Sequence, residues 1–159
     1  MSDRFPGDIT IGGDIPHRLL DLLSEMIASE GVSIDWQYTL GKAAVQKVIE
    51  DAVARKETVR FTDDEACYGQ FEELEGFLVE RGIHFDRHSD ARYEYDGENA
   101  YYRGGRKVIV MPAGQNGDPL VRCQDTLNIM DSSKADKAKL ESIRRLVAVP
   151  ASLKPIRFA

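Results

Sequence analysis

The sequence is short of three things: long apolar runs, cysteine, and the glycine patterns of phosphate-binding loops. Its longest apolar stretches, such as Val108 to Met111, fall far short of the roughly 20 residues that a membrane-spanning helix needs. Met1 to Asp14 carries acids, Gly and Pro where a secretory signal has a basic start and an apolar core. We therefore expect a cytoplasmic protein with no membrane partner.

The two cysteines, Cys67 and Cys123, lie far apart and belong to no CxxC or Cys/His motif. We expect reduced thiols, with neither a disulfide scaffold nor a zinc site. The run ITIGGDIPHR contains paired glycines but neither G-x-G-x-x-G nor G-K-[ST], so it does not predict a phosphate-binding loop. No segment carries a catalytic or cofactor signature, and we expect a protein that is not an enzyme and has no cofactor.

Charge is unevenly distributed along a chain whose net charge is -6. Residues 50–100 hold 15 acids and 6 bases, whereas residues 101–159 hold 5 acids and 11 bases. An acidic middle and a basic C-terminal third predict either two surfaces of opposite sign or two parts that pack together and neutralise each other.

Size and composition predict a single globular domain over residues 1–159, with 42% hydrophobic and 30% charged residues. Residues 1–8 are polar with Pro and Gly, and we expect them to form a flexible arm. Residues 150–159 follow the last helical pattern as a C-terminal tail. The apolar residues in this tail favour docking on a surface, which can be that of the domain itself.

The pattern around which the chain is organised lies between Val59 and Tyr95, where a strand, a helix and a second strand are followed by a Tyr-rich hairpin arm. Val59 and Phe61 alternate as a strand, an amphipathic helix follows, Gly82 ends it, and Ile83 and Phe85 alternate again. The apolar face of this helix is made of Phe71, Leu74, Phe77 and Leu78. Helix capping is expected from Thr62, Asp63 or Asp64.

The same strand-helix-strand plan occurs earlier, with strands at Ile9–Ile11 and Val32–Ile34 around a helical stripe at Leu20–Ile27. A second helix, Leu40–Arg55, links the two units. Two such units predict an α/β (α+β) fold with a ferredoxin-like, open, mostly antiparallel sheet and helices on one face. A true duplication is one explanation, and the general similarity of all strand-helix-strand units is the other.

The C-terminal third predicts a meander and a final helix. We expect antiparallel strands at Arg92–Asp96 and Ala100–Arg103, then a well-buried strand at Arg106–Met111. A helix from about Lys134, capped by Ser132 or Ser133, is expected to close the domain. Its apolar stripe consists of Leu140, Ile143, Leu146 and Val147.

The first candidate site is an alternating run of imidazoles and carboxylates: His84, Asp86, His88 and Asp90. These side chains share one face if the strand continues, and could bind a divalent metal or act as an acid-base pair in a metal-assisted hydrolase. Because Ile83 and Phe85 fill the core, a solvated polar face explains the same pattern. A bound metal is not predicted.

The second candidate is an aromatic and basic cluster on the meander, made of Arg87, Tyr93, Tyr95, Tyr101, Tyr102 and Arg103. Rings flanked by guanidinium groups stack bases and hold phosphates in single-stranded nucleic-acid binders. Tyr and Arg are equally typical of protein interfaces. Glu94, Asp96 and Glu98 lie among the rings and would repel phosphate, which favours a protein interface or a purely structural role.

The third candidate is the acidic face of the central helix, represented by Glu72 and Glu73, which could meet a basic partner or be merely solvated. We interpret the chain as a small acidic, non-enzymatic adaptor or inhibitor-like protein with a protein partner. In its general character it is similar to small acidic accessory proteins of phages and plasmids that act on host nucleic-acid-handling or defence complexes. The sequence does not indicate an oligomeric state.

Overall fold

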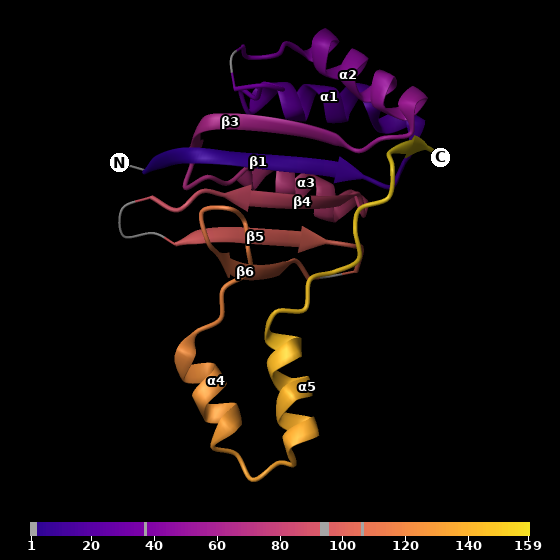
Figure 1. Ribbon diagram of the computed structural model, residues 1–159. Helices are drawn as coiled ribbons and strands as arrows, with labels where there is room; N and C mark the ends of the chain where they lie inside the picture. Colours follow the sequence, from indigo (N-terminus) through magenta and orange to yellow (C-terminus); the bar gives the residue numbers. More distant parts are fainter. Residues whose placement is uncertain (1–2, 37, 93–95, 106) are drawn as a thin grey trace.

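A five-stranded antiparallel sheet forms the centre of the computed structural model, which describes residues 3–36, 38–92, 96–105 and 107–159. The strand order is β3-β1-β4-β5-β6 (Figure 1). The strands are β1 (Arg4–Gly12), β3 (Val59–Cys67), β4 (His84–Ser89), β5 (Gly97–Tyr102) and β6 (Ile109–Ala113). A short parallel pair, β2 (Asp14–Ile15) and β7 (Arg157–Phe158), joins the segment after β1 to the end of the chain.

Strand β1 is an inner strand of the sheet and pairs antiparallel with β3 on one side and β4 on the other. Ile9 lies opposite Phe61 in β3 and opposite Arg87 in β4. Since β3 and β4 both run against β1, they are parallel to each other, and helix α3 (Glu72–Arg81) connects them. The result is one split β-α-β unit.

The core lies on one face of the sheet, because alternate residues of a strand point to opposite faces. Ile9, Phe61 and Phe85 are fully buried there against the helices. The covering helices are α1 (Leu20–Ser29), which follows the short 3-10 turn His17–Leu19, α2 (Lys42–Arg55) and α3. In Figure 1, α3 lies behind β1 and β4 while α1 and α2 lie beside β3. In the described part of the chain, no helix covers the opposite face (Figure 1).

Helix α3 ends as the sequence predicts, at Gly82, which adopts the left-handed conformation with φ 68°. Its predicted caps are wrong, because Asp63 and Asp64 lie within β3 and the helix begins only at Glu72. The physical reason is the partner strand: β1 pairs with β3 as far as Cys67 and holds these polar residues in the sheet.

The first predicted unit is incomplete. Instead of a strand at Val32–Ile34, the structure has a single bridge between Ser33 and Thr62. Only the mixed α+β class with an antiparallel sheet is therefore shown, and the ferredoxin-like arrangement is not confirmed. The expected flexible arm is also wrong for residues 4–8, which belong to β1, with Phe5 buried.

The meander differs from the expected one. Both edges of β5 are occupied, by β4 and β6, and residues 93–95 of the strand expected at Arg92–Asp96 lie outside the described residues. The expected buried strand at Arg106–Met111 is instead β6, an edge strand in which Ile109 and Val110 are exposed. Among the described residues, no helix has the length and apolarity required to cross a membrane.

The C-terminal tail docks on its own domain, as its apolar residues favour. Ile156 is buried in the core, and its amide donates to the carbonyl of Glu57 at 2.9 Å. The Gly13 amide donates to the Lys154 carbonyl at 3.0 Å, which holds the tail across the end of the sheet. The segment that follows β1 and the end of the chain are thereby tied together.

Candidate functional site

Two helices leave the domain entirely. After β6 the chain forms α4 (Cys123–Met130) and α5 (Asp136–Leu146), an antiparallel pair that projects away from the sheet (Figure 1). Neither helix has a buried residue. We call residues 120–149 the helical hairpin. The sequence predicts that the last helix closes the core, and this prediction is wrong.

The hairpin stays outside because its apolar stripe is narrow. Lys137, Glu141 and Arg144 flank Leu140 on α5, and burying such charges without partners is costly. The predicted serine cap is also absent, since Ala135 occupies the N-cap position of α5 and makes no side-chain bond. The turn between the helices is instead held by the Lys139 ammonium, which donates to the Met130 carbonyl at 2.8 Å.

Exposed apolar side chains gather on this hairpin and at its base. Of the 14 large hydrophobic residues that are exposed in the described part of the chain, nine lie between residues 109 and 149. They are Ile109, Val110, Leu120, Leu127, Met130, Leu140, Leu146, Val147 and Val149. Scattered single exposures need no explanation, but a concentration on one projecting element is typical of surfaces through which proteins interact.

The charge of the hairpin differs in sign from that of the sheet domain. Residues 120–149 hold six basic and four acidic side chains, whereas residues 1–119 hold 13 basic and 23 acidic ones. The apolar surface is therefore set among a small excess of positive charge. The opposite signs expected from the sequence do fall on separate parts of the structure.

The acidic candidate lies elsewhere, at the start of α3. Glu72 and Glu73 are exposed and border a hollow of about 360 Å³ together with Glu30 and Asp63. Burial raises the pKa of Glu30 above its ordinary value, and the neighbouring carboxylates raise it further. The hydrogen bond that Glu30 accepts from the Leu74 amide lowers this pKa in part. This surface is negative enough to meet a basic partner, and its binding role stays a prediction.

The aromatic and basic candidate is not gathered on one open surface. Arg87 is only 4% exposed and Tyr102 only 1% exposed, so both side chains belong to the interior. Tyr102 donates to the carbonyls of Val79 and Gly105, at 3.1 and 2.9 Å, and thus ties β5 to α3.

The other members of this candidate are divided between the sheet and the undescribed part of the chain. Tyr101 is half-buried on the open face, where burial is the first cause that raises the pKa of its phenol. Arg103 pairs with Asp86 at 2.6 Å. Tyr93 and Tyr95 lie outside the described residues. Binding through the exposed members stays a prediction.

The histidine and aspartate candidate does share the open face, but its members are engaged with different partners. Nδ1 of His88 lies 2.7 Å from the Asn99 side-chain oxygen, and Nε2 lies 3.1 Å from Asp90. Asp86 is occupied by Arg103. Over the ranges that the structure describes, no three His, Cys, Asp or Glu side chains converge as a metal site requires.

Comparisons of the chain with protein-family models, with curated proteins and with solved structures find no match. Function is therefore inferred from the geometry of the chain's own residues.

Proposed function

We propose that this chain is a small non-enzymatic, adaptor- or inhibitor-like protein that binds another protein through the helical hairpin. One observation carries the proposal: α4 and α5 have no buried residue and expose Leu127, Met130, Leu140 and Leu146 on an element that stands clear of the domain. Because these two helices bury no residue in the domain core, their apolar side chains remain accessible to a partner protein.

The partner that fits is a protein with an apolar groove rimmed by carboxylates. An amphipathic helix binds such a groove through anchors three, four and seven residues apart, and Leu140 and Val147 have the last of these spacings. The net positive charge of the hairpin favours an acidic rim. A host nucleic-acid-handling or defence complex is the partner class that we propose.

The free energies of burial and association indicate how much of the hairpin must contact a partner. Full burial of a Leu or Met side chain contributes about 1.5–3 kcal/mol, and these residues are already about half buried, so each adds roughly 1 kcal/mol. Association itself costs at least about 4 kcal/mol. Several anchors together with Ile109 and Val110 on β6 are therefore needed, which predicts a contact along the whole hairpin and its base.

We place the protein in the cytoplasm. Both thiols, Cys67 and Cys123, are free and exposed, and exposed unpaired thiols suit a reducing compartment.

Affinity capture tests the proposal, with nuclease-treated host lysate and four baits: wild type, Leu127→Ser/Leu140→Ser, Glu72→Lys/Glu73→Lys, and Leu22→Ser as a matched control. Leu22 is a comparably exposed leucine on α1, outside the hairpin. A partner recovered with wild type is then purified, and its affinity for each bait is measured by calorimetry at two salt concentrations.

We expect the double leucine variant to weaken binding at least tenfold, the Leu22 variant to bind as wild type does, and added salt to weaken the complex. Equal binding by wild type and the double leucine variant would refute the hairpin as the site. Selective loss with the glutamate variant would transfer the site to α3. A dimer in light scattering that the double leucine variant dissociates would show that a second copy occupies the surface.

A further inference from the structure

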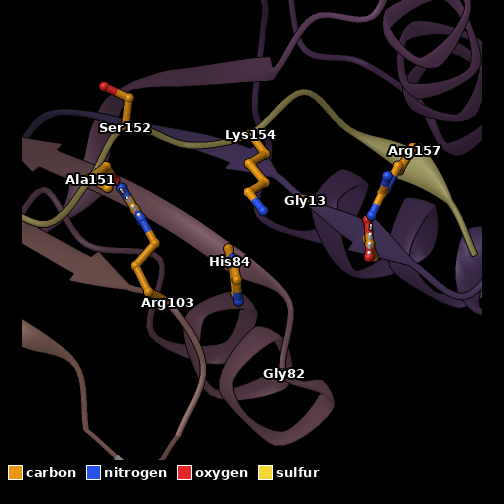
Figure 2. A pocket seen from close by; sticks show the side chains of 9 residues that line it. Gly13, Gly82, His84, Arg103, Ala151, Ser152, Lys154 and Arg157 are labelled. Carbon is orange, nitrogen blue, oxygen red and sulfur yellow. Dashed lines mark hydrogen bonds and ion pairs between the residues drawn. The ribbon is translucent and has the colours of Figure 1, made fainter.

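A second feature of the fold stands apart from the hairpin: a pocket where the C-terminal tail crosses the end of the sheet. Its volume is about 340 Å³, within the range of small-molecule sites. Its principal side chains come from four segments that lie apart in the sequence: Asp14, His84, Arg103, Lys154 and Arg157. Figure 2 labels His84, Arg103, Lys154 and Arg157. The topology assembles them because β1 and β5 end at this edge and β4 begins there.

The lining of this pocket is positively charged in an acidic protein. Asp14 pairs with Arg157 and Asp86 pairs with Arg103, so the ammonium of Lys154 leaves this cluster with a net charge of +1. The pKa of Asp14 is lowered, first by the hydrogen bond from Arg157 and further by the charges of Arg157, Lys154 and His84. Arg157, Lys154 and His84 therefore all lie close enough to Asp14 to affect its carboxylate.

Arg103 and Arg157 are fixed in position, and each keeps N–H donors that no described residue uses. Arg157 binds Asp14 through Nε and Nη2. Arg103 donates through Nε to the Ala151 carbonyl at 3.0 Å and through Nη1 to the Phe85 carbonyl at 3.0 Å. Each guanidinium has five N–H donors, so one terminal nitrogen of each is left for a ligand.

Lys154 supplies the free charge. Its backbone is held by the bond from the Gly13 amide, and no ion pair or hydrogen bond from the described residues occupies its ammonium. Figure 2 shows its side chain reaching from the tail toward His84 and Gly13, between Arg103 on one side and Arg157 on the other. The backbone approach depends on glycine, because a Cβ on Gly12 would lie 2.4 Å from the Lys154 carbonyl oxygen.

We infer that this pocket binds the phosphate group of a small phosphate monoester. The oxygens of a phosphate group accept from the two fixed guanidinium groups, and its negative charge is attracted by the ammonium of Lys154, which forms no ion pair among the described residues. The volume leaves room for a small organic body beyond the phosphate. The inference is independent of the hairpin, since no hairpin residue from 120 to 149 lines the pocket.

Amide shifts of the ¹⁵N-labelled full chain are recorded while inorganic phosphate, glycerol phosphate or chloride is added at constant ionic strength. We expect both phosphates, and not chloride, to shift Gly13, His84 and Lys154. Lys154→Gln should weaken phosphate binding at least tenfold. Lys137→Gln removes the same charge from α5, far from the pocket, and should leave the affinity unchanged.

Inorganic phosphate binding more tightly than the monoester would assign the site to free phosphate. The inference is overturned if the pocket amides do not move, if Lys137→Gln weakens binding as much as Lys154→Gln, or if a single-stranded oligonucleotide binds more tightly than either phosphate. Thermal melts of the two variants confirm that both are folded. The Leu127→Ser/Leu140→Ser variant should bind phosphate as wild type does, so failure of either proposal leaves the other standing.

Discussion

Arg87 lies 2.9 Å from the carboxylate of Glu75, inside the layer between β4 and α3. The contact is an ion pair without hydrogen-bond geometry at Nε, and the guanidinium also pairs with Glu98 through Nη2. A buried charge with two carboxylate partners fixes the position of α3 on the sheet. Arg87, which the sequence suggests as a binding residue, thus stabilises the packing of α3 on the sheet.

The first prediction concerns this arginine. Arg87→Leu should lower the free energy of unfolding by about 3–5 kcal/mol, because it leaves Glu75 and Glu98 without their cation. Urea unfolding measures the loss. Arg92→Leu, nearby in sequence on an exposed residue, is the comparison and should cost far less. Equal effects of the two substitutions would contradict a structural role specific to Arg87.

The second prediction uses two glycines in opposite surroundings. Gly12→Ala should destabilise by about 1–3 kcal/mol, because the new Cβ meets the Lys154 carbonyl oxygen at 2.4 Å and pushes the tail away. Gly76→Ala, inside α3 with no atom within 4 Å of the added carbon, should stabilise by about 0.5–1 kcal/mol. Thermal melts of the two variants should therefore shift in opposite directions, and a shared direction would show that the tail does not lie against Gly12.

The third prediction follows from the raised pKa of Glu30, of which burial is the first cause. The folded state binds this proton more tightly than the unfolded state, so the group's stabilising contribution is present at low pH. It is lost as the pH rises from the ordinary value of 4.5 through the folded pKa. Glu30→Gln keeps an oxygen that can accept from the Leu74 amide and removes the charge.

We therefore expect Glu30→Gln to be more stable than wild type at pH 7, by less than about 1 kcal/mol because the group is partly solvated. The difference should vanish near pH 4. Glu80→Gln, on an exposed position of α3, provides the control and should show no comparable pH-dependent gain. A stability difference for Glu30→Gln that grows toward low pH would refute the assigned sign.

The fourth prediction concerns independence of the hairpin from the domain. Replacing residues 122–149 by a flexible linker of about ten residues should leave the domain folded, with a melting temperature within a few degrees of wild type. The reason is that neither α4 nor α5 buries a residue. Calorimetry measures the shift, and loss of cooperative unfolding would mean that the hairpin is part of the core.

The sequence predicts the elements whose periodicity agrees with their burial. The helix expected at Leu40–Arg55 is confirmed as α2, which buries Val45, Ile49 and Ala52 at helical spacing, and α3 ends at Gly82 as predicted. The extension of β3 to Cys67 could not be read from the acids at 63–65, since a pairing strand from the other end of the domain decides it. Long-range pairing overrides local pattern there.

The binding surface that we propose on the helical hairpin could not be predicted from the sequence, for a different reason. The apolar spacing seen from Leu140 to Val147 is the same in a helix that packs on its own domain and in a helix that binds a partner protein. Trp36, the single tryptophan, is 40% exposed with φ 66°, so a large aromatic side chain does not by itself indicate a core position. The available signal was the excess of basic residues after residue 100, which distinguishes the hairpin from the acidic domain.

The most direct measurement of the central proposal is photo-crosslinking in the native host, with a photoreactive residue in place of Leu140, Leu127 or Glu80. The hairpin account predicts a protein adduct of one defined mass from positions 140 and 127, and none from position 80 on α3. Adducts from position 80 alone, or none from either hairpin position while the protein is folded and expressed, would contradict the assignment of partner binding to the helical hairpin.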